Sequence, residues 1–183
     1  MRLGAASARP EPVSRPPSPW TRSTVRAELL ALYAEADALL DGWTCACSAS
    51  GVGSSTAARC CHFALTGREP YPTAVEIEEV RHAARAASLP LRDLRRLPQV
   101  DLRTCPLLGP GGRCRVYASR PFGCRTYFCD SAEAPYGASA KLPRRALASL
   151  GRRIADLSAR FAPLDPHPRP LLRALAQDGR APR

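Results

Sequence analysis

The stretch GRCRVYASRPFGCRTYFC, Gly112–Cys129, holds three of the chain's eight cysteines together with four arginines and four aromatic residues. Its only aliphatic side chain larger than alanine is Val116. Burial of aliphatic side chains is a main source of order in a folded chain, and this stretch has little of that kind to bury. We therefore expect a metal ion or an inorganic cluster, bound through cysteine sulfur, to hold this part of the chain in place.

The other five cysteines form a C-x-C pair, an adjacent pair and a single residue, namely Cys45, Cys47, Cys60, Cys61 and Cys105. Adjacent and C-x-C cysteines are poorly placed to form disulfides with each other, whereas a metal tolerates both arrangements. Residues 1–22 lack the apolar core of a signal peptide, and no apolar run is long enough to span a membrane. We therefore expect a cytoplasmic protein with no membrane contact, whose reduced thiols serve as metal ligands or redox groups.

All eight cysteines are candidate metal ligands: Cys45, Cys47, Cys60, Cys61, Cys105, Cys114, Cys124 and Cys129. Their spacings match neither the C-x2-C zinc knuckle nor the C-x2-C-x2-C run of ferredoxins. An iron–sulfur cluster and a zinc or iron ion therefore both stay open as the cofactor. His62 follows the adjacent pair and is interpreted as a neighbour of the site, because the cysteines already suffice as ligands.

Arg120, Arg125 and Tyr117 are the candidate residues that surround the cofactor. Four thiolates on a zinc ion or a cluster carry net negative charge, which nearby guanidinium groups offset, and donors to sulfur orient the ligands. Pro121 biases Arg120 towards an extended backbone, which helps to space the flanking cysteines. The aromatic side chains of the stretch are expected to wall the site from water: Tyr117, Phe122, Tyr127 and Phe128.

The adjacent cysteines, a following Thr-x-x-Glu helix start, a Cys-Pro-Leu-Leu segment and GRCRVYASRPFGCRTYFC together resemble the bacterial YkgJ-like cysteine-cluster proteins. These are described as zinc- or iron-chelating proteins, and the resemblance is sharpest over Cys105–Cys129. It implies metal or iron–sulfur binding, and a similar cluster in the flagellin lysine methylase family implies an enzymatic relative. The chain departs from the pattern in the twelve residues between Cys47 and Cys60, which leaves open whether Cys45 or Cys47 is a ligand.

Three segments have the periodicity of amphipathic helices. The first covers about 25–40 and follows Ser23 or Thr24 as its cap. The second is AVEIEEVRHAARAAS, which the capping box Thr73–Glu76 opens. The third follows Pro143 and repeats apolar residues at three- and four-residue steps, at Leu147, Leu150, Ile154, Leu157 and Phe161. These elements predict a mainly α fold, a single small domain of about three helices around irregular, cysteine-bearing, metal-binding loops.

The chain is expected to divide into a disordered Pro/Arg-rich tail over 1–22, a cysteine-cluster domain over 23–162 and a Pro-rich tail over 163–183. Within the last tail, one short helical turn is expected around Leu171–Ala176, and Leu91–Leu102 is interpreted as a helical turn followed by extended chain. The net charge of +11 invites a nucleic-acid hypothesis. The arginines are spread along the chain and form no block, which argues against nucleic acid as a partner.

The resulting hypothesis is a small cytoplasmic protein that binds an iron–sulfur cluster or a zinc or iron ion. Its role would be metal handling, electron transfer or recognition of an unidentified protein partner. No catalytic residue is assigned. One alternative is a cluster-supported, methylase-like modifying enzyme, although no segment is left over to bind a cosubstrate. The other is a thiol redox sensor in which Cys60 with Cys61, or Cys45 with Cys47, oxidises reversibly.

Overall fold

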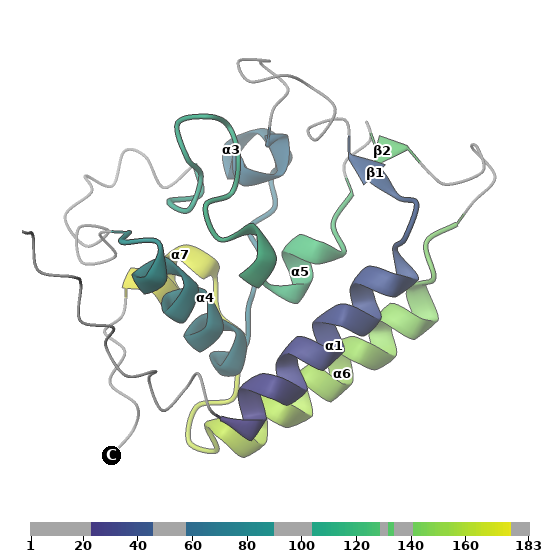
Figure 1. The fold of residues 1–183 in the computed structure, drawn as a ribbon, viewed down its shortest axis with the longest axis vertical. Helices are drawn as coiled ribbons and strands as arrows, with labels where there is room; N and C mark the ends of the chain where they lie inside the picture. Colours follow the sequence, from purple (N-terminus) through teal and green to yellow (C-terminus); the bar gives the residue numbers. More distant parts are fainter. Residues whose placement is uncertain (1–22, 46–57, 90–103, 129–131, 134–140, 177–183) are drawn as a thin grey trace, which may run out of the picture.

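The computed structural model describes residues 23–45, 58–89, 104–128, 132–133 and 141–176 (Figure 1). Over these residues the protein is mainly helical, as predicted. The α-helices are α1 Thr24–Leu39, α3 Phe63–Thr66, α4 Ala74–Ala86, α5 Phe122–Arg125, α6 Arg144–Phe161 and α7 Leu171–Ala176. Two 3-10 turns, η2 Arg59–Cys61 and η5 Tyr117–Ser119, and an antiparallel pair of two-residue strands, β1 Thr44–Cys45 and β2 Ala132–Glu133, complete the described elements.

Helices α1 and α6 lie side by side and run in opposite directions along one edge of the molecule (Figure 1). Their facing sides, together with Val75 of α4, form one hydrophobic cluster, built from Leu29, Leu32, Tyr33, Ala36, Leu150, Ile154, Leu157 and Val75. Each fully buried leucine or isoleucine contributes about 1.5–3 kcal/mol of transfer free energy. Two ion pairs, Arg153–Glu35 and Arg160–Glu28, join the exposed sides of the same helices. The predicted core stripe of α6 is confirmed except at Phe161, which is 37% exposed.

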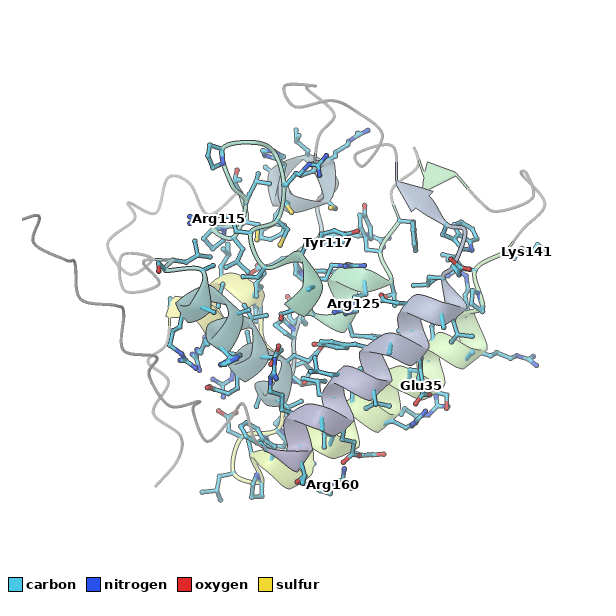
Figure 2. All side chains as sticks on the ribbon, viewed as in Figure 1. Glu35, Arg115, Tyr117, Arg125, Lys141 and Arg160 are labelled. Atoms are coloured by element: carbon cyan, nitrogen blue, oxygen red, sulfur yellow. The ribbon has the colours of Figure 1, made fainter. Side chains whose placement is uncertain are left out.

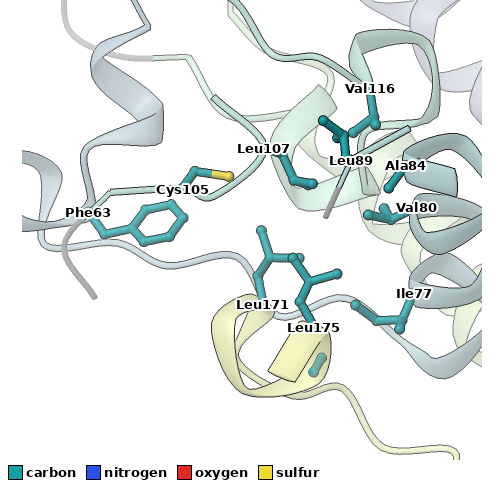
Figure 3. Close-up of a cluster of buried hydrophobic side chains, with 11 residues drawn as sticks. Phe63, Ile77, Val80, Ala84, Leu89, Cys105, Leu107, Val116, Leu171 and Leu175 are labelled. Carbon is teal, nitrogen blue, oxygen red and sulfur yellow. The ribbon is translucent and has the colours of Figure 1, made fainter. Parts of the chain in front are cut away.

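A second hydrophobic cluster lies between α4, α7 and the cysteine-bearing loops (Figure 3). Ile77 and Val80 from α4 meet Leu107 and Val116 from the loops in this cluster. Leu171 of α7 is 1% exposed there, so α7 is a packed part of the core although the sequence analysis assigned it to a Pro-rich tail. The cysteine loops therefore rest on an apolar floor that is supplied mostly by other segments.

Helix α4 lies between the two clusters, because Val75 faces the first and Ile77 and Val80 face the second. The predicted capping box is present at its start: the backbone N–H and the hydroxyl of Thr73 both donate to Glu76 Oε2 at 2.8 Å. At the start of α1 the cap residue is Ser23, as predicted, but its side chain makes no capping hydrogen bond.

No helix in the described ranges is both long enough and apolar enough to span a membrane. The predictions for 1–22, for 91–102 and for 177–183 fall outside the residues that the structure describes.

Candidate metal centre

The adjacent cysteines Cys60 and Cys61 are placed by the short turn η2. Ala58 precedes this turn in a left-handed conformation, with φ of 52°, and its carbonyl accepts a hydrogen bond of 2.7 Å from Cys61 N. Beyond the turn, Cys105 N donates a hydrogen bond of 2.7 Å to Cys61 O. Cys61 and Cys105, which are 44 positions apart in the chain, are thereby held next to each other by a backbone hydrogen bond.

Cys114 is placed by a tight hairpin that runs from Leu107 to Arg115. Arg115 N donates to Leu107 O at 2.8 Å, and Gly109 N donates to Arg113 O at 2.8 Å. The hairpin requires glycine at position 112, whose φ of 68° is costly for any residue with a Cβ atom. This geometry holds Cys114 opposite Leu108, its bridge partner.

Cys124 lies on the four-residue helix α5, directly after the Arg120–Pro121 step. Arg120 is extended, with φ of −62° and ψ of 141°, as the following proline predicts. Pro121 O then accepts hydrogen bonds from Cys124 N at 2.9 Å and Arg125 N at 3.0 Å. The proline therefore ends the extended segment and starts the turn that presents Cys124.

The three segments converge on one cavity of about 860 Å³. All five cysteines whose side chains the structure describes line it: Cys60, Cys61, Cys105, Cys114 and Cys124. Sulfur atoms gather beside the loop that carries Arg115 and Tyr117 (Figure 2). Of the other candidate ligands, Cys45 is described only as backbone in β1, and Cys47 and Cys129 lie outside the described residues.

The thiols are close enough to change one another's ionisation. Hydrogen bonding with Cys61 is the main cause that raises the pKa of Cys60, and burial adds to it. Hydrogen bonding with Cys105 is the main cause that raises the pKa of Cys61 to about 12. These contacts favour the protonated thiols over the thiolates.

Four of the five thiols form a mutually interacting set. Burial raises the pKa values of Cys114 and Cys124, and negative charge on neighbouring sulfurs raises them further. Every pair drawn from Cys60, Cys61, Cys114 and Cys124 interacts in this way. Cys105, by contrast, is 7% exposed, belongs to the hydrophobic cluster in Figure 3 and contacts the set through Cys61.

Arg120 faces the cavity and stacks on Tyr117, with its guanidinium carbon 3.9 Å from the ring centroid. Its positive charge lowers the pKa values of Cys60 and Cys114, which opposes the larger effects of thiol contact and burial. Tyr117 lines the same cavity and is 62% exposed, so it forms an outer wall of the site. This pair can stabilise negative charge on sulfur from the solvent side.

Arg125 also lines the cavity, but its guanidinium is used to fix the backbone. It donates to the carbonyl oxygens of Arg120 and Ala118 and to the carboxylate of Asp37 on α1. The guanidinium carbon also lies 4.1 Å above the ring of Tyr33. Arg125 is 5% exposed, so this side chain ties the loop before α5 to α1 from inside the fold.

Two buried carboxylates support the site from α4. Glu76 was predicted only as part of the capping box, and no role was predicted for Glu79. Glu76, 3% exposed, accepts hydrogen bonds from Phe122 N at 2.7 Å and from the Tyr33 hydroxyl at 3.3 Å. Glu79, fully buried, accepts from the Ser119 hydroxyl at 2.8 Å and pairs with Arg26. The signal in the sequence was helical spacing, because Glu76 precedes the core residue Val80 by four positions and Glu79 follows the core residue Val75 by four positions.

Other expected neighbours of the site are arranged differently. Tyr127 and Phe128 line the cavity, whereas Phe122 packs against the cluster between α1 and α6. His62 is absent from the cavity lining and has its Nδ1 3.4 Å from the Thr104 hydroxyl. Within the described residues, no three Cys, His, Asp or Glu side chains stand at ligating distance around a common point. The five described cysteines therefore share one cavity wall with other residues and do not form a tetrahedral ligand set.

Comparisons with family models, curated proteins and solved structures give no match to this chain. The resemblance to the YkgJ-like proteins therefore rests on the cysteine, arginine and proline motif itself.

Proposed function

We propose that this protein binds an iron–sulfur cluster, or a zinc or iron ion, through its cysteines. The observation that carries this proposal is the convergence of five cysteine side chains, from segments around residues 60, 105 and 114–124, on one cavity. Buried structural cysteines, in contrast, are usually distributed through a core as small apolar residues. A shared position around an open space is expected of ligands.

The spacing of the ligand side chains favours a cluster over a single ion. Four thiolates close on a zinc ion at about 2.3 Å. Within the described residues, no three Cys, His, Asp or Glu side chains stand that close around one point. A cluster places its own iron and sulfide atoms between the cysteine ligands and so bridges sulfurs that stand further apart.

Among the described cysteines, the mutually interacting set is the best candidate ligand group: Cys60, Cys61, Cys114 and Cys124. Loading a metal centre would displace protons from these thiols, since the ligand is the thiolate. Arg120 would offset the resulting negative charge, and the wall formed by Tyr117 and the neighbouring aromatic side chains would limit water access.

The experiment is anaerobic purification of the full chain, followed by iron, zinc and acid-labile sulfide analysis and a visible absorption spectrum. A cluster predicts iron and sulfide in comparable amounts with visible absorption, whereas a single-ion site predicts colourless protein with bound zinc or iron. We expect Cys124→Ser to lose most of the metal. The control His62→Ala should retain it, because His62 does not line the cavity. Folded wild-type protein that holds neither metal nor sulfide would contradict the proposal.

A further inference from the structure

Cys61 and Cys105 have a relationship that the other described cysteines do not share. His62 and Thr104 form an antiparallel bridge. In that register Cys61, which precedes His62, stands opposite Cys105, which follows Thr104. The backbone hydrogen bond from Cys105 N to Cys61 O, 2.7 Å long, fixes this register. Opposed residues of an antiparallel pair project their side chains to the same face. The two thiols also interact, because Cys105 is the main cause that raises the pKa of Cys61.

This geometry meets the requirements of a disulfide. In a regular antiparallel ladder, residues that exchange both backbone hydrogen bonds have Cα atoms about 5.5 Å apart. Here one of the two bonds is present, from Cys105 N to Cys61 O, because Cys61 N donates to Ala58 O at the end of η2. A disulfide spans Cα separations of about 4.4–6.8 Å, so the bond needs little backbone movement. Cys60 and Cys61, the adjacent pair, are in contact as well, but a disulfide between neighbours in the chain requires a strained ring. Cys124 lies on α5 and is not backbone-paired to either residue.

We propose that Cys61 and Cys105 form a reversible disulfide that blocks loading of the metal centre. Two thiols lose two electrons and two protons, a sulfur–sulfur bond forms, and hydrogen peroxide accepts both electrons and protons to give two molecules of water. One thiol, as its thiolate, attacks a peroxide oxygen to give a sulfenic acid and the first molecule of water. The opposed thiol then attacks the sulfenic sulfur, which forms the sulfur–sulfur bond and releases the second molecule of water. Both residues line the cavity, and the partly exposed Cys61 is the one that a small peroxide reaches first. A dithiol reductant reverses the reaction.

The regulatory consequence rests on the proposed function, whereas the disulfide itself does not. Cys61 interacts with each of the other three members of the candidate ligand set. A disulfide at Cys61 removes one ligand from the set, and its partner Cys105 is buried in the hydrophobic cluster against which Cys61 and Cys114 pack. The metal-free oxidised protein is therefore unable to load metal until it is reduced. A loaded centre, in turn, occupies Cys61 and prevents the oxidation.

The cross-link can be read directly from tryptic peptides. Cleavage after arginine separates CCHFALTGR (60–68), TCPLLGPGGR (104–113) and VYASRPFGCR (116–125), because the bond before Pro121 resists trypsin. Metal-free, reduced full-length protein is treated with hydrogen peroxide, remaining thiols are alkylated, and the digest is analysed without reductant by mass spectrometry. We expect the first two peptides to be joined. The joined species should persist in Cys60→Ser and disappear in Cys61→Ser.

Metal loading is then compared before and after peroxide, in the wild type and in Cys105→Ser. We expect peroxide to reduce wild-type loading at least tenfold with recovery on dithiothreitol, and Cys105→Ser to keep most of its loading.

Wild-type protein that loads metal but yields a Cys60–Cys61 or Cys61–Cys124 product instead would overturn the inference and leave the proposed function standing. Wild-type protein that forms the expected cross-link but never loads metal in any state would contradict the proposed function and the regulatory step. Peptide mapping of the wild type decides the cross-link even if Cys105→Ser folds poorly.

Discussion

Single side chains with several partners hold the cysteine loops to the helices. Glu76 is the clearest case, because each of its carboxylate oxygens accepts two hydrogen bonds: Oε1 from Phe122 N and the Tyr33 hydroxyl, Oε2 from the backbone and hydroxyl of Thr73. One residue thus caps α4, starts α5 and reaches α1. An acidic residue early in a helix suggests only a favourable interaction with the helix dipole, so these distant partners could not be predicted from the sequence.

Glu76→Gln should lower the free energy of unfolding by about 1–3 kcal/mol. A glutamine has a single acceptor oxygen, so its amide nitrogen must face at least one of the buried donors and leave it unsatisfied. Denaturant titration followed by circular dichroism measures the effect. The matched control is Glu78→Gln on the same helix, where the carboxylate is partly exposed and pairs with exposed Arg85. An equal effect of the two substitutions would contradict the assigned role of Glu76.

Tyr33 should make stability fall at alkaline pH. Burial, with nearby Glu76 adding to it, raises the pKa of Tyr33 well above its ordinary value of 10.0. Above that value the unfolded chain releases the phenolic proton while the folded chain keeps it, so stability is lost as pH rises. We expect Tyr33→Phe to flatten the fall in unfolding free energy above about pH 10, and Tyr71→Phe, at an exposed position, to keep the wild-type slope. Parallel curves of unfolding free energy against pH for the wild type and Tyr33→Phe would contradict the role of Tyr33 in the alkaline loss of stability.

The short helices take their positions from contacts outside themselves. Helix α5 has four residues and α7 has six, too few to be stable alone. Their existence therefore depends on what they pack against. The long helices α1, α4 and α6 were predictable from apolar periodicity and capping. The packing of α7 into the core was not, because the apolar surface that it covers is formed jointly by α4 and the loops, and no local pattern reveals that surface.

Arg125→Lys should destabilise the protein by about 2–4 kcal/mol, because a lysine cannot reproduce the planar fork of a buried arginine. The substitution would loosen the loop that joins Arg120 to α5, and we expect metal loading to weaken with it. The control is Arg153→Lys, where the side chain is 52% exposed and the pair with Glu35 is on the surface. Thermal unfolding of the metal-free forms separates the two positions. Similar small effects at both would show that Arg125 does not anchor the loop.

Leu171→Ala should cost about 2–5 kcal/mol, the range for truncation of a fully buried leucine. Leu171 is 1% exposed and packs with the residues of Figure 3. Leu164→Ala, at a position that is 78% exposed, should change the unfolding free energy by less than about 0.5 kcal/mol. Urea unfolding distinguishes the two variants. If Leu171→Ala were as mild as Leu164→Ala, α7 would not be part of the core.

Across the molecule, the cysteine-bearing loops pack with α4 and α7 in one hydrophobic cluster, whereas α1 and α6 pair in the other (Figure 1). The mainly α fold and its three long helices were predictable because they follow from local periodicity. The convergence of Cys60 and Cys61 with Cys105, Cys114 and Cys124 was expected from chemistry alone, since sequence spacing does not encode distances between loops. The backbone pairing of Cys61 with Cys105, and the division of the thiols into a set of four and a fifth, required the structure.

The central claim is that sulfurs from distant segments share one inorganic centre. X-ray absorption spectroscopy of the anaerobically purified full chain, at the edge of whichever metal it contains, counts the atoms bound to that metal. The account predicts a first shell made of about four sulfur atoms per metal, with Cys124→Ser losing the metal or replacing one sulfur by oxygen. A first shell dominated by nitrogen and oxygen, unchanged in Cys124→Ser, would contradict it.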